Sequence, residues 1–294
     1  MNVLTTTLWS TFLQTCAHLK TPFKIFDHTT LNEKQQINAS AQLLAGEMPS
    51  LKYYAIGNGG HRYVAGKNGF PLISPIQHLA DHAALYNQLP FVLRAMDNDL
   101  SADERNAYAM RSIFPWEGRN YYAYWLKRLD LSGVVPGLKS TIVEDGVSNT
   151  TEYIPTTACL NPVAPDISNT TAVTTSGEYL SSSAILSIPF TERDVTELLN
   201  VAKILYNDEQ YAVISEFAFV TGVDRVLSIP ITGGSINYLE AIAAQVATFV
   251  SAYYQMVFNT KGFDFRMEVG AVEPLLGAES IITAQRVPIT VTSN

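Results

Sequence analysis

The stretch Ser235–Asn259, SINYLEAIAAQVATFVSAYYQMVFN, carries a single charged residue, Glu240. Its larger apolar side chains recur at intervals of three and four residues, which is the spacing of an α-helix. The opposite side of that helix would carry mainly alanine and serine in place of lysine and glutamate. A helix without a solvated face must be covered on every side. We therefore predict a long uncharged helix near the C-terminus, covered in part by another subunit.

The composition is that of a folded, acidic protein. The chain has 294 residues, enough for one large domain or two ordinary ones, and its 47% hydrophobic content argues against disorder. A formal charge of −8 argues against broad binding to nucleic-acid phosphates, which requires a cationic surface. Cys16 and Cys159 are too few for a disulfide framework. Residues 241–258 lack cationic flanks, so we expect no membrane span.

The pattern of elements predicts an α+β fold whose N-terminal third is richer in helices. Two short strands, 52–56 and 61–65, flank Gly57-Asn58-Gly59-Gly60 and are predicted to form a hairpin. A capping box at Ser101 and Glu104 is predicted to open one of the helices. The predicted helices of this region span residues 4–19, 31–45, 76–87, 91–96 and 101–112.

The remainder of the chain is predicted to be rich in strands. One further helix, Thr191–Asn207, is opened by a capping pattern at Thr191 and Asp194. The Thr-, Ser- and Asn-rich tract 156–183 is predicted to be a long ordered loop or extended arm. We divide the chain into residues 1–115 and 116–294, which could also form one continuous domain. The predicted strands span residues 121–129, 140–143, 151–154, 185–189, 211–220, 226–231, 263–269 and 286–292, with a turn at 145–146.

One pair of histidines is spaced as in metal-binding helices. His78 and His82 would lie on one helical face with Asp81 between them, similar to a class of zinc proteases that has Glu in place of Asp. This pattern suggests a metal-dependent hydrolase as an alternative function. No third ligand is evident, however, and we favour the structural interpretation, a half-buried helix with polar histidines at its edge. We expect no catalytic residues, no cofactor and no metal.

Aromatic and β-branched side chains are the other distinctive feature. Exposed aromatic rings are favoured at binding surfaces and can also stack on sugars, so a carbohydrate-binding module that uses Tyr122, Tyr124 and Trp125 is a further alternative. The C-terminal segment Arg286–Asn294 could add a strand to a neighbour's sheet. The candidate interface residues are Tyr122, Tyr124, Trp125, Phe249, Tyr253, Tyr254, Val287, Ile289 and Val291.

The low charge and the Thr/Ser/Asn-rich strands and arms resemble virion structural proteins of tailed bacteriophages. The segment that carries the resemblance best is 61–111, HRYVAGKNGFPLISPIQHLADHAALYNQLPFVLRAMDNDLSADERNAYAMR. The resemblance implies a neck, tail or baseplate subunit that is made in the host cytoplasm and assembles into a ring or wedge. Its partners would be further copies of itself and other virion proteins, without direct contact to nucleic acid or membrane.

Overall fold

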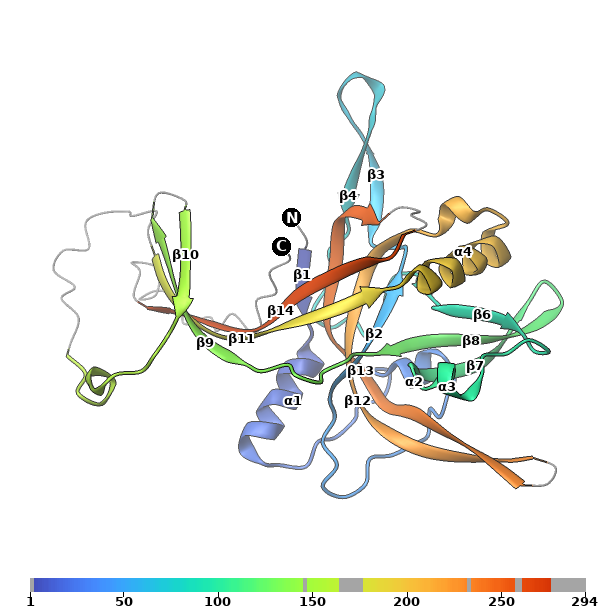
Figure 1. The fold of residues 1–294 in the computed structure, drawn as a ribbon, viewed down its shortest axis with the longest axis horizontal. Helices are drawn as coiled ribbons and strands as arrows, with labels where there is room; N and C mark the ends of the chain where they lie inside the picture. Colours follow the sequence, from blue (N-terminus) through green and yellow to red (C-terminus); the bar gives the residue numbers. More distant parts are fainter. Residues whose placement is uncertain (1–2, 145–146, 164–176, 232–233, 257–260, 276–294) are drawn as a thin grey trace. The chain divides into compact units, whose positions relative to one another are not determined.

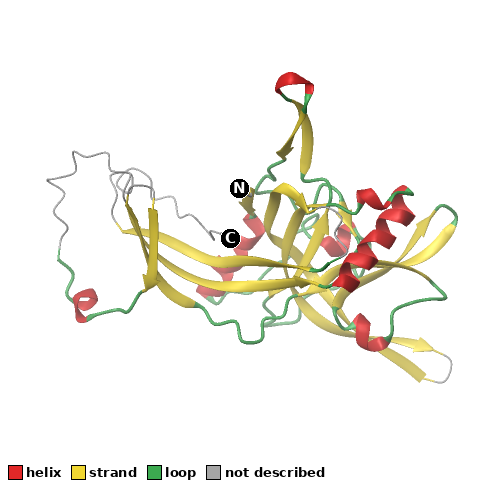
Figure 2. Ribbon diagram, turned by 45° about the horizontal axis from the view of Figure 1, so that its top comes forward, coloured by secondary structure: helices red, strands yellow, loops and turns green. Residues whose placement is uncertain are grey.

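The computed structural model is built largely of antiparallel strands (Figures 1 and 2). It describes the chain except residues 1–2, 145–146, 164–176, 232–233, 257–260 and 276–294. Strands make up 48% and helices 19% of the structure. The α+β prediction with a helix-richer N-terminal third is therefore wrong. The four α-helices of the described part are α1 (Leu8–Leu19), α2 (Leu31–Lys34), α3 (Ala102–Arg105) and α4 (Glu192–Tyr206).

The largest sheet has eight strands. Its order is β1-β13-β12-β2-β8-β6, with β5 paired to β2 and β7 paired to β8. Helices α1 and α2 contact β13, and α4 contacts β6, so helices cover parts of this sheet. The strands are β1 (Val3–Thr6), β2 (Ser50–Gly57), β5 (Gln88–Leu89), β6 (Val92–Ala95), β7 (Tyr108–Trp116), β8 (Arg119–Arg128), β12 (Ile214–Ile231) and β13 (Gly234–Met256).

Two smaller sheets complete the described structure. A four-stranded sheet has the order β10-β9-β11-β14, and β3 and β4 form a separate two-stranded sheet. The strands are β3 (His61–Ala65), β4 (Pro71–Pro75), β9 (Gly137–Glu144), β10 (Val147–Glu152), β11 (Gly177–Phe190) and β14 (Phe263–Leu275). Short 3-10 turns are η1 (Lys67–Gly69), η2 (Thr157–Leu160) and η3 (Glu209–Tyr211).

The chain forms two compact units, and neither is continuous in sequence. Unit 1 comprises residues 1–130 and 188–265, and unit 2 comprises residues 131–187 and 266–294. The boundary between them falls within β11 and within β14. Unit 1 contains a hydrophobic core in which Tyr53, Trp125 and Phe249 are buried.

The predicted helix 235–259 is instead the long strand β13, and this is the decisive correction. β13 pairs with β12 from Gly234 opposite Ile231 to Met256 opposite Ile214. Residues 241–252 are all buried, so both faces of this part of the strand are covered. A strand covered on both faces is apolar without interruption, and periodicity alone cannot separate it from a buried helix. The β-branched and aromatic side chains of this segment fit the strand.

A bulge in β13 is stabilised by one buried side chain. Ala243 has a positive φ of 54°, and the β12–β13 register shifts at this point. The side-chain amide of Asn32 donates to the carbonyl of Ala241 at 2.9 Å, and its oxygen accepts from the N–H of Ala244 at 2.9 Å. The Asn32 amide thus takes the place of a neighbouring strand where the ladder is interrupted.

Several other predicted helices are absent or much shorter. Residues 4–19 divide into β1 and α1, and the segment 31–45 is helical only in α2. Residues 76–87 form no helix, and 91–96 contains β6. The capping box at Ser101 and Glu104 is confirmed, but its helix ends at Arg105 and β7 follows. Pairing with β8 overrides the local helical pattern in β6 and β7.

The later predictions agree better with the structure. The Thr191–Asp194 capping box opens α4, as predicted. The two strands predicted at 211–220 and 226–231 are parts of the single strand β12. Strands 52–56 and 61–65 are confirmed as β2 and β3, but the hairpin between them is wrong, because β2 pairs with β12, β5 and β8 whereas β3 pairs with β4. The turn at 145–146, residues 164–176 of the arm and the strand 286–292 lie outside the described residues.

Candidate functional site

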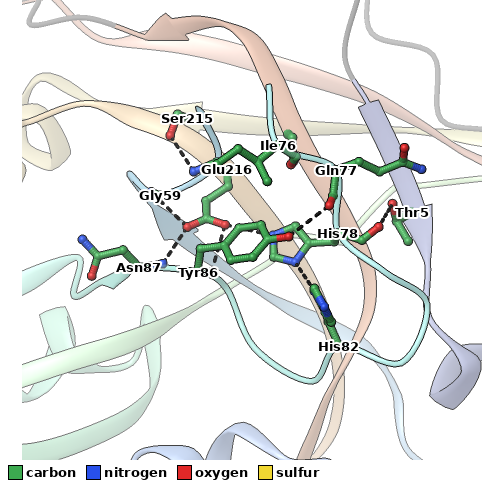
Figure 3. A network of polar contacts seen from close by, with 12 residues as sticks. Thr5, Gly59, Ile76, Gln77, His78, His82, Tyr86, Asn87, Ser215 and Glu216 are labelled. Carbon is green, nitrogen blue, oxygen red and sulfur yellow. Dashed lines mark hydrogen bonds and ion pairs between the residues drawn. The ribbon is translucent and has the colours of Figure 1, made fainter. Parts of the chain in front are cut away.

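The segment 76–87 is a loop that places His78 in the core of unit 1 (Figure 3). Side chains from three other parts of the unit hold its backbone. Ser251 donates to the carbonyl of Ile76 at 2.5 Å, and Thr5 donates to the carbonyl of His78 at 2.9 Å. The indole N–H of Trp9 donates to the carbonyl of His82 at 3.3 Å. These contacts fix the loop on β1, α1 and β13.

The centre of the site is the carboxylate of Glu216, on β12, whose side chain is fully buried. Its Oε1 accepts from the backbone N–H groups of Gly59 at 3.1 Å and Asn87 at 2.9 Å. Its Oε2 accepts from the N–H of Tyr86 at 3.2 Å and contacts His78 Nε2 at 2.9 Å. A buried carboxylate is tolerated when its oxygens accept several hydrogen bonds, and here four donors converge on it.

His78 is stacked between two aromatic rings. Its imidazole lies 3.8 Å from the ring centroid of Phe249, nearly parallel, and 4.2 Å from that of Tyr86. Its Nδ1 is 3.2 Å from His82 Nδ1, which also accepts from the N–H of Leu79 at 3.3 Å. The two ring nitrogens of His78 therefore face two different partners, the Glu216 carboxylate and the ring of His82.

Two glycines allow the chain to approach Glu216. A Cβ atom on Gly57 would lie 2.5 Å from the Asn87 carbonyl oxygen and 2.6 Å from Glu216 Oε1. A Cβ atom on Gly60 would lie 2.6 Å from the carbonyl oxygen of Ser215. The glycine-rich segment that suggests a hairpin turn in the sequence therefore wraps closely around a buried carboxylate.

We call this group the His78–Glu216 cluster. It holds separate parts of unit 1 together through hydrogen bonds. Its members are Gly59, His78, His82, Tyr86, Asn87 and Glu216. His78 directs Nε2 at Glu216 and Nδ1 at His82, while Asp81 is exposed. Within the described ranges, no three His, Cys, Asp or Glu side chains are grouped to hold a metal ion. The polar contacts of the cluster run from Glu216 through His78 to His82. Its contacts join the connection between β2 and β3, the 76–87 loop, β12 and β13.

Sequence reasoning identified His78 and His82 but missed Glu216. The available signal was a lone carboxylate within the otherwise uncharged and mainly apolar segment 214–220, ISEFAFV. A buried Asp or Glu needs a partner, so this residue predicts a buried donor elsewhere in the chain. Nothing in the local sequence indicates that the donors are His78 and two separate stretches of backbone.

The candidate interface residues have varied environments. Tyr124, Trp125 and Phe249 are buried within unit 1, whereas Tyr122 is half-buried with the Arg111 guanidinium 3.8 Å from its ring centroid. Of the three rings suggested for sugar stacking, only Tyr122 is thus partly accessible. The side chains of Tyr253 and Tyr254, and the residues Val287, Ile289 and Val291, lie outside what the structure describes.

Comparison of the sequence with known proteins identifies one matching family, whose function is not known. A model described as a family of unknown function, DUF7208, matches residues 1–284. No curated protein and no solved structure is significantly similar to the chain. None of the helices in the described part is both long enough and apolar enough to span a membrane. The match extends over nearly the whole sequence, and the chain therefore belongs to the DUF7208 family.

Proposed function

We propose that this chain is a structural subunit of an assembly built from copies of itself, and that the β3–β4 hairpin makes the contact between copies. The hairpin extends away from the other strands of unit 1 (Figure 1). It forms its own two-stranded sheet. Its strands contact β13, but a two-stranded hairpin has little stability of its own in water, so a partner surface would stabilise it.

The side chains of the hairpin support this role. Tyr63 lies opposite Ile73 and Val64 lies opposite Leu72, so apolar side chains occupy both faces. Phe70 is 74% exposed, and Tyr63, Leu72 and Ile73 are between 38% and 64% exposed. Contiguous exposed apolar groups of this kind mark interaction sites in soluble proteins. This exposed apolar hairpin is the observation on which the proposal rests.

The charge of the hairpin favours a second copy of this chain as its partner. Residues 61–75 contain Arg62 and Lys67 and no acidic residue, whereas the whole chain has a formal charge of −8. A cationic projection on an acidic protein is attracted to another molecule of the same protein. Heterologous contacts of this type generate rings when the rotation between subunits closes.

The more specific proposal is a tailed-phage virion subunit of the neck, tail or baseplate. It is supported by the resemblance of 61–111, which includes the hairpin, and by a charged content of only 16%. The rival hydrolase hypothesis would require zinc at His78 and His82. Metal analysis of the purified protein separates the two, because stoichiometric zinc that is lost in His82→Ala would favour the hydrolase.

The test of self-assembly is the solution mass of the protein and of its variants, measured by light scattering after size exclusion. We expect the wild type to form particles that are multiples of the 32.3 kDa chain. Phe70→Ser combined with Leu72→Ser should yield monomers. Val135→Ser is the matched control, because Val135 is an exposed apolar residue outside the hairpin, and it should leave the particles intact. A monomeric wild type, or a double variant of unchanged mass, would refute the proposal.

A further inference from the structure

A second feature of unit 1, independent of assembly, is a cavity of about 220 Å³ between α3, β7, β8 and β13. Its walls include the charged side chains of Arg105, Arg111 and Glu240, and the ring of Tyr238. Small-molecule sites are concave and combine apolar walls with a few convergent polar groups. This cavity has that composition, and Met110 contributes to its apolar wall.

Two guanidinium groups in the wall share a single carboxylate partner. Asp99 Oδ2 lies 2.8 Å from Arg111 Nη2 and 3.4 Å from Arg105 Nη2. The other oxygen of Asp99 accepts from the Tyr124 hydroxyl at 2.6 Å. Arg105 Nη1 donates to the Tyr238 hydroxyl at 3.1 Å. The pair of arginines therefore carries one more positive charge than Asp99 neutralises.

Below about pH 7, Glu240 does not supply the missing negative charge. Burial raises the pKa of Glu240 to about 7, although the Arg111 N–H donates to its Oε2. Arg128 and Arg225 also lie near this carboxyl group, but Arg128 pairs with Asp224 and Arg225 pairs with Glu47. A Glu240 carboxyl group that keeps its proton can donate a hydrogen bond to a ligand.

We propose that the cavity binds a small organic monocarboxylate, whose carboxylate group lies between the guanidinium groups of Arg105 and Arg111 and the carboxyl group of Glu240. Arginine recognises carboxylates through paired hydrogen bonds. A single negative charge balances the excess charge of the arginine pair. Inorganic phosphate is mainly singly charged at pH 6 and has no apolar body, so its contacts would be limited to the charged end of the cavity, and the site favours an organic carboxylate over phosphate. Three tyrosines in the wall, Tyr108, Tyr124 and Tyr238, suit a flat ligand body.

The test is an NMR titration of the full chain with benzoate, with its neutral analogue benzamide and with inorganic phosphate. We expect benzoate to shift resonances of the cavity residues, and to bind at least tenfold more tightly than benzamide or phosphate at pH 6. Binding should weaken about tenfold from pH 6 to pH 8 as Glu240 ionises. Glu240→Gln should retain binding at pH 6 and lose most of this pH dependence.

A cavity-filling variant provides the structural control. Ala102 is an exposed residue of the cavity wall, so Ala102→Trp should abolish benzoate binding while the spectrum remains that of a folded protein. Ala158→Trp, at an exposed position in η2, should bind as the wild type does. The proposal is overturned if folded wild-type protein does not bind benzoate, if benzamide binds equally well, or if Ala102→Trp binds benzoate unchanged.

Discussion

Glu216 joins parts of the chain that are distant in sequence. One carboxylate satisfies backbone donors at Gly59, Tyr86 and Asn87 as well as the ring of His78. Each of these donors is withdrawn from water when the chain folds, and an unpaired one would cost about 1–3 kcal/mol. The buried side chain therefore contributes through the groups it satisfies more than through charge attraction alone.

Replacing Glu216 by Gln tests this role with almost no change in volume. The amide nitrogen cannot accept hydrogen bonds, so it would face donors that now bind a carboxylate oxygen, and His78 would lose its charged partner. We expect Glu216→Gln to lower the free energy of unfolding by about 3–5 kcal/mol, measured by urea denaturation. Glu209→Gln, which removes only an exposed ion pair with Lys203, should cost less than about 1 kcal/mol. If Glu216→Gln were as stable as this control, the Glu216 carboxylate would not be needed to hold the His78–Glu216 cluster together.

Glu240 should make stability depend on pH. The folded-state pKa of about 7 lies above the ordinary value of 4.5, because burial disfavours the charged form. Between these pH values the unfolded chain releases a proton that the folded chain retains, so stability falls as the pH rises through this window. We expect this loss to reach about 3 kcal/mol and to be absent in Glu240→Gln, measured by urea denaturation from pH 4.5 to 8. If the free energy of unfolding of the wild type and of Glu240→Gln changed with pH in the same way, Glu240 would not be the cause of the pH dependence.

At the scale of elements, β13 depends on a side chain from α2. Asn32 is almost fully buried and bonds to both sides of the bulge at Ala243. Asn32→Ala would leave the Ala241 carbonyl and the Ala244 N–H without this partner. We expect a loss of about 2–4 kcal/mol in the free energy of unfolding. Asn120→Ala, at an exposed position of β8, is the control and should change stability by less than about 0.5 kcal/mol. Equal effects of the two substitutions would show that the bulge does not need the Asn32 amide.

Patterns formed by residues close together in the sequence predicted some helices and strands correctly and others wrongly. The capping boxes at Ser101 and Thr191 were identified correctly, because a cap is formed by residues that are neighbours in sequence. The long strand β13 was mistaken for a helix, because its cover on both faces comes from elements far away in the chain. The bulge at Ala243 also breaks strict alternation, which removes the usual signature of a strand.

The candidate site was likewise predicted only in part from the sequence. His78 and His82 stand out in the sequence, but the helix that would align them does not form, and Glu216, the partner of His78, lies 138 positions away from it. Glycines 57 and 60 were recognised as special, although the reason is their close approach to Glu216 and Ser215 rather than a hairpin turn. Pairings of this kind depend on the tertiary fold.

At the scale of the whole molecule, self-assembly through the hairpin should respond to charge. Lys67 is exposed in η1, at the end of the hairpin, and an acidic partner surface would repel a carboxylate there. We expect Lys67→Glu to weaken association by about tenfold or more, measured by sedimentation over a range of concentrations. Lys34→Glu, an exposed charge reversal at the end of α2, should have a much smaller effect. Equal weakening by both would indicate a general effect of net charge and would exclude the hairpin as the charged contact.

The division into units restricts how the protein can be dissected. The chain passes from one unit to the other after Asp130, again after Ser187 and a third time after Phe265. A single truncation therefore cannot deliver either unit intact: stopping at Asp130 removes α4, β12 and β13 from unit 1. Isolating unit 1 would require residues 131–187 to be replaced by a linker and the chain to end near Phe265. By the same logic, one protease cut at any of these crossings would leave two fragments that both contribute residues to the same unit.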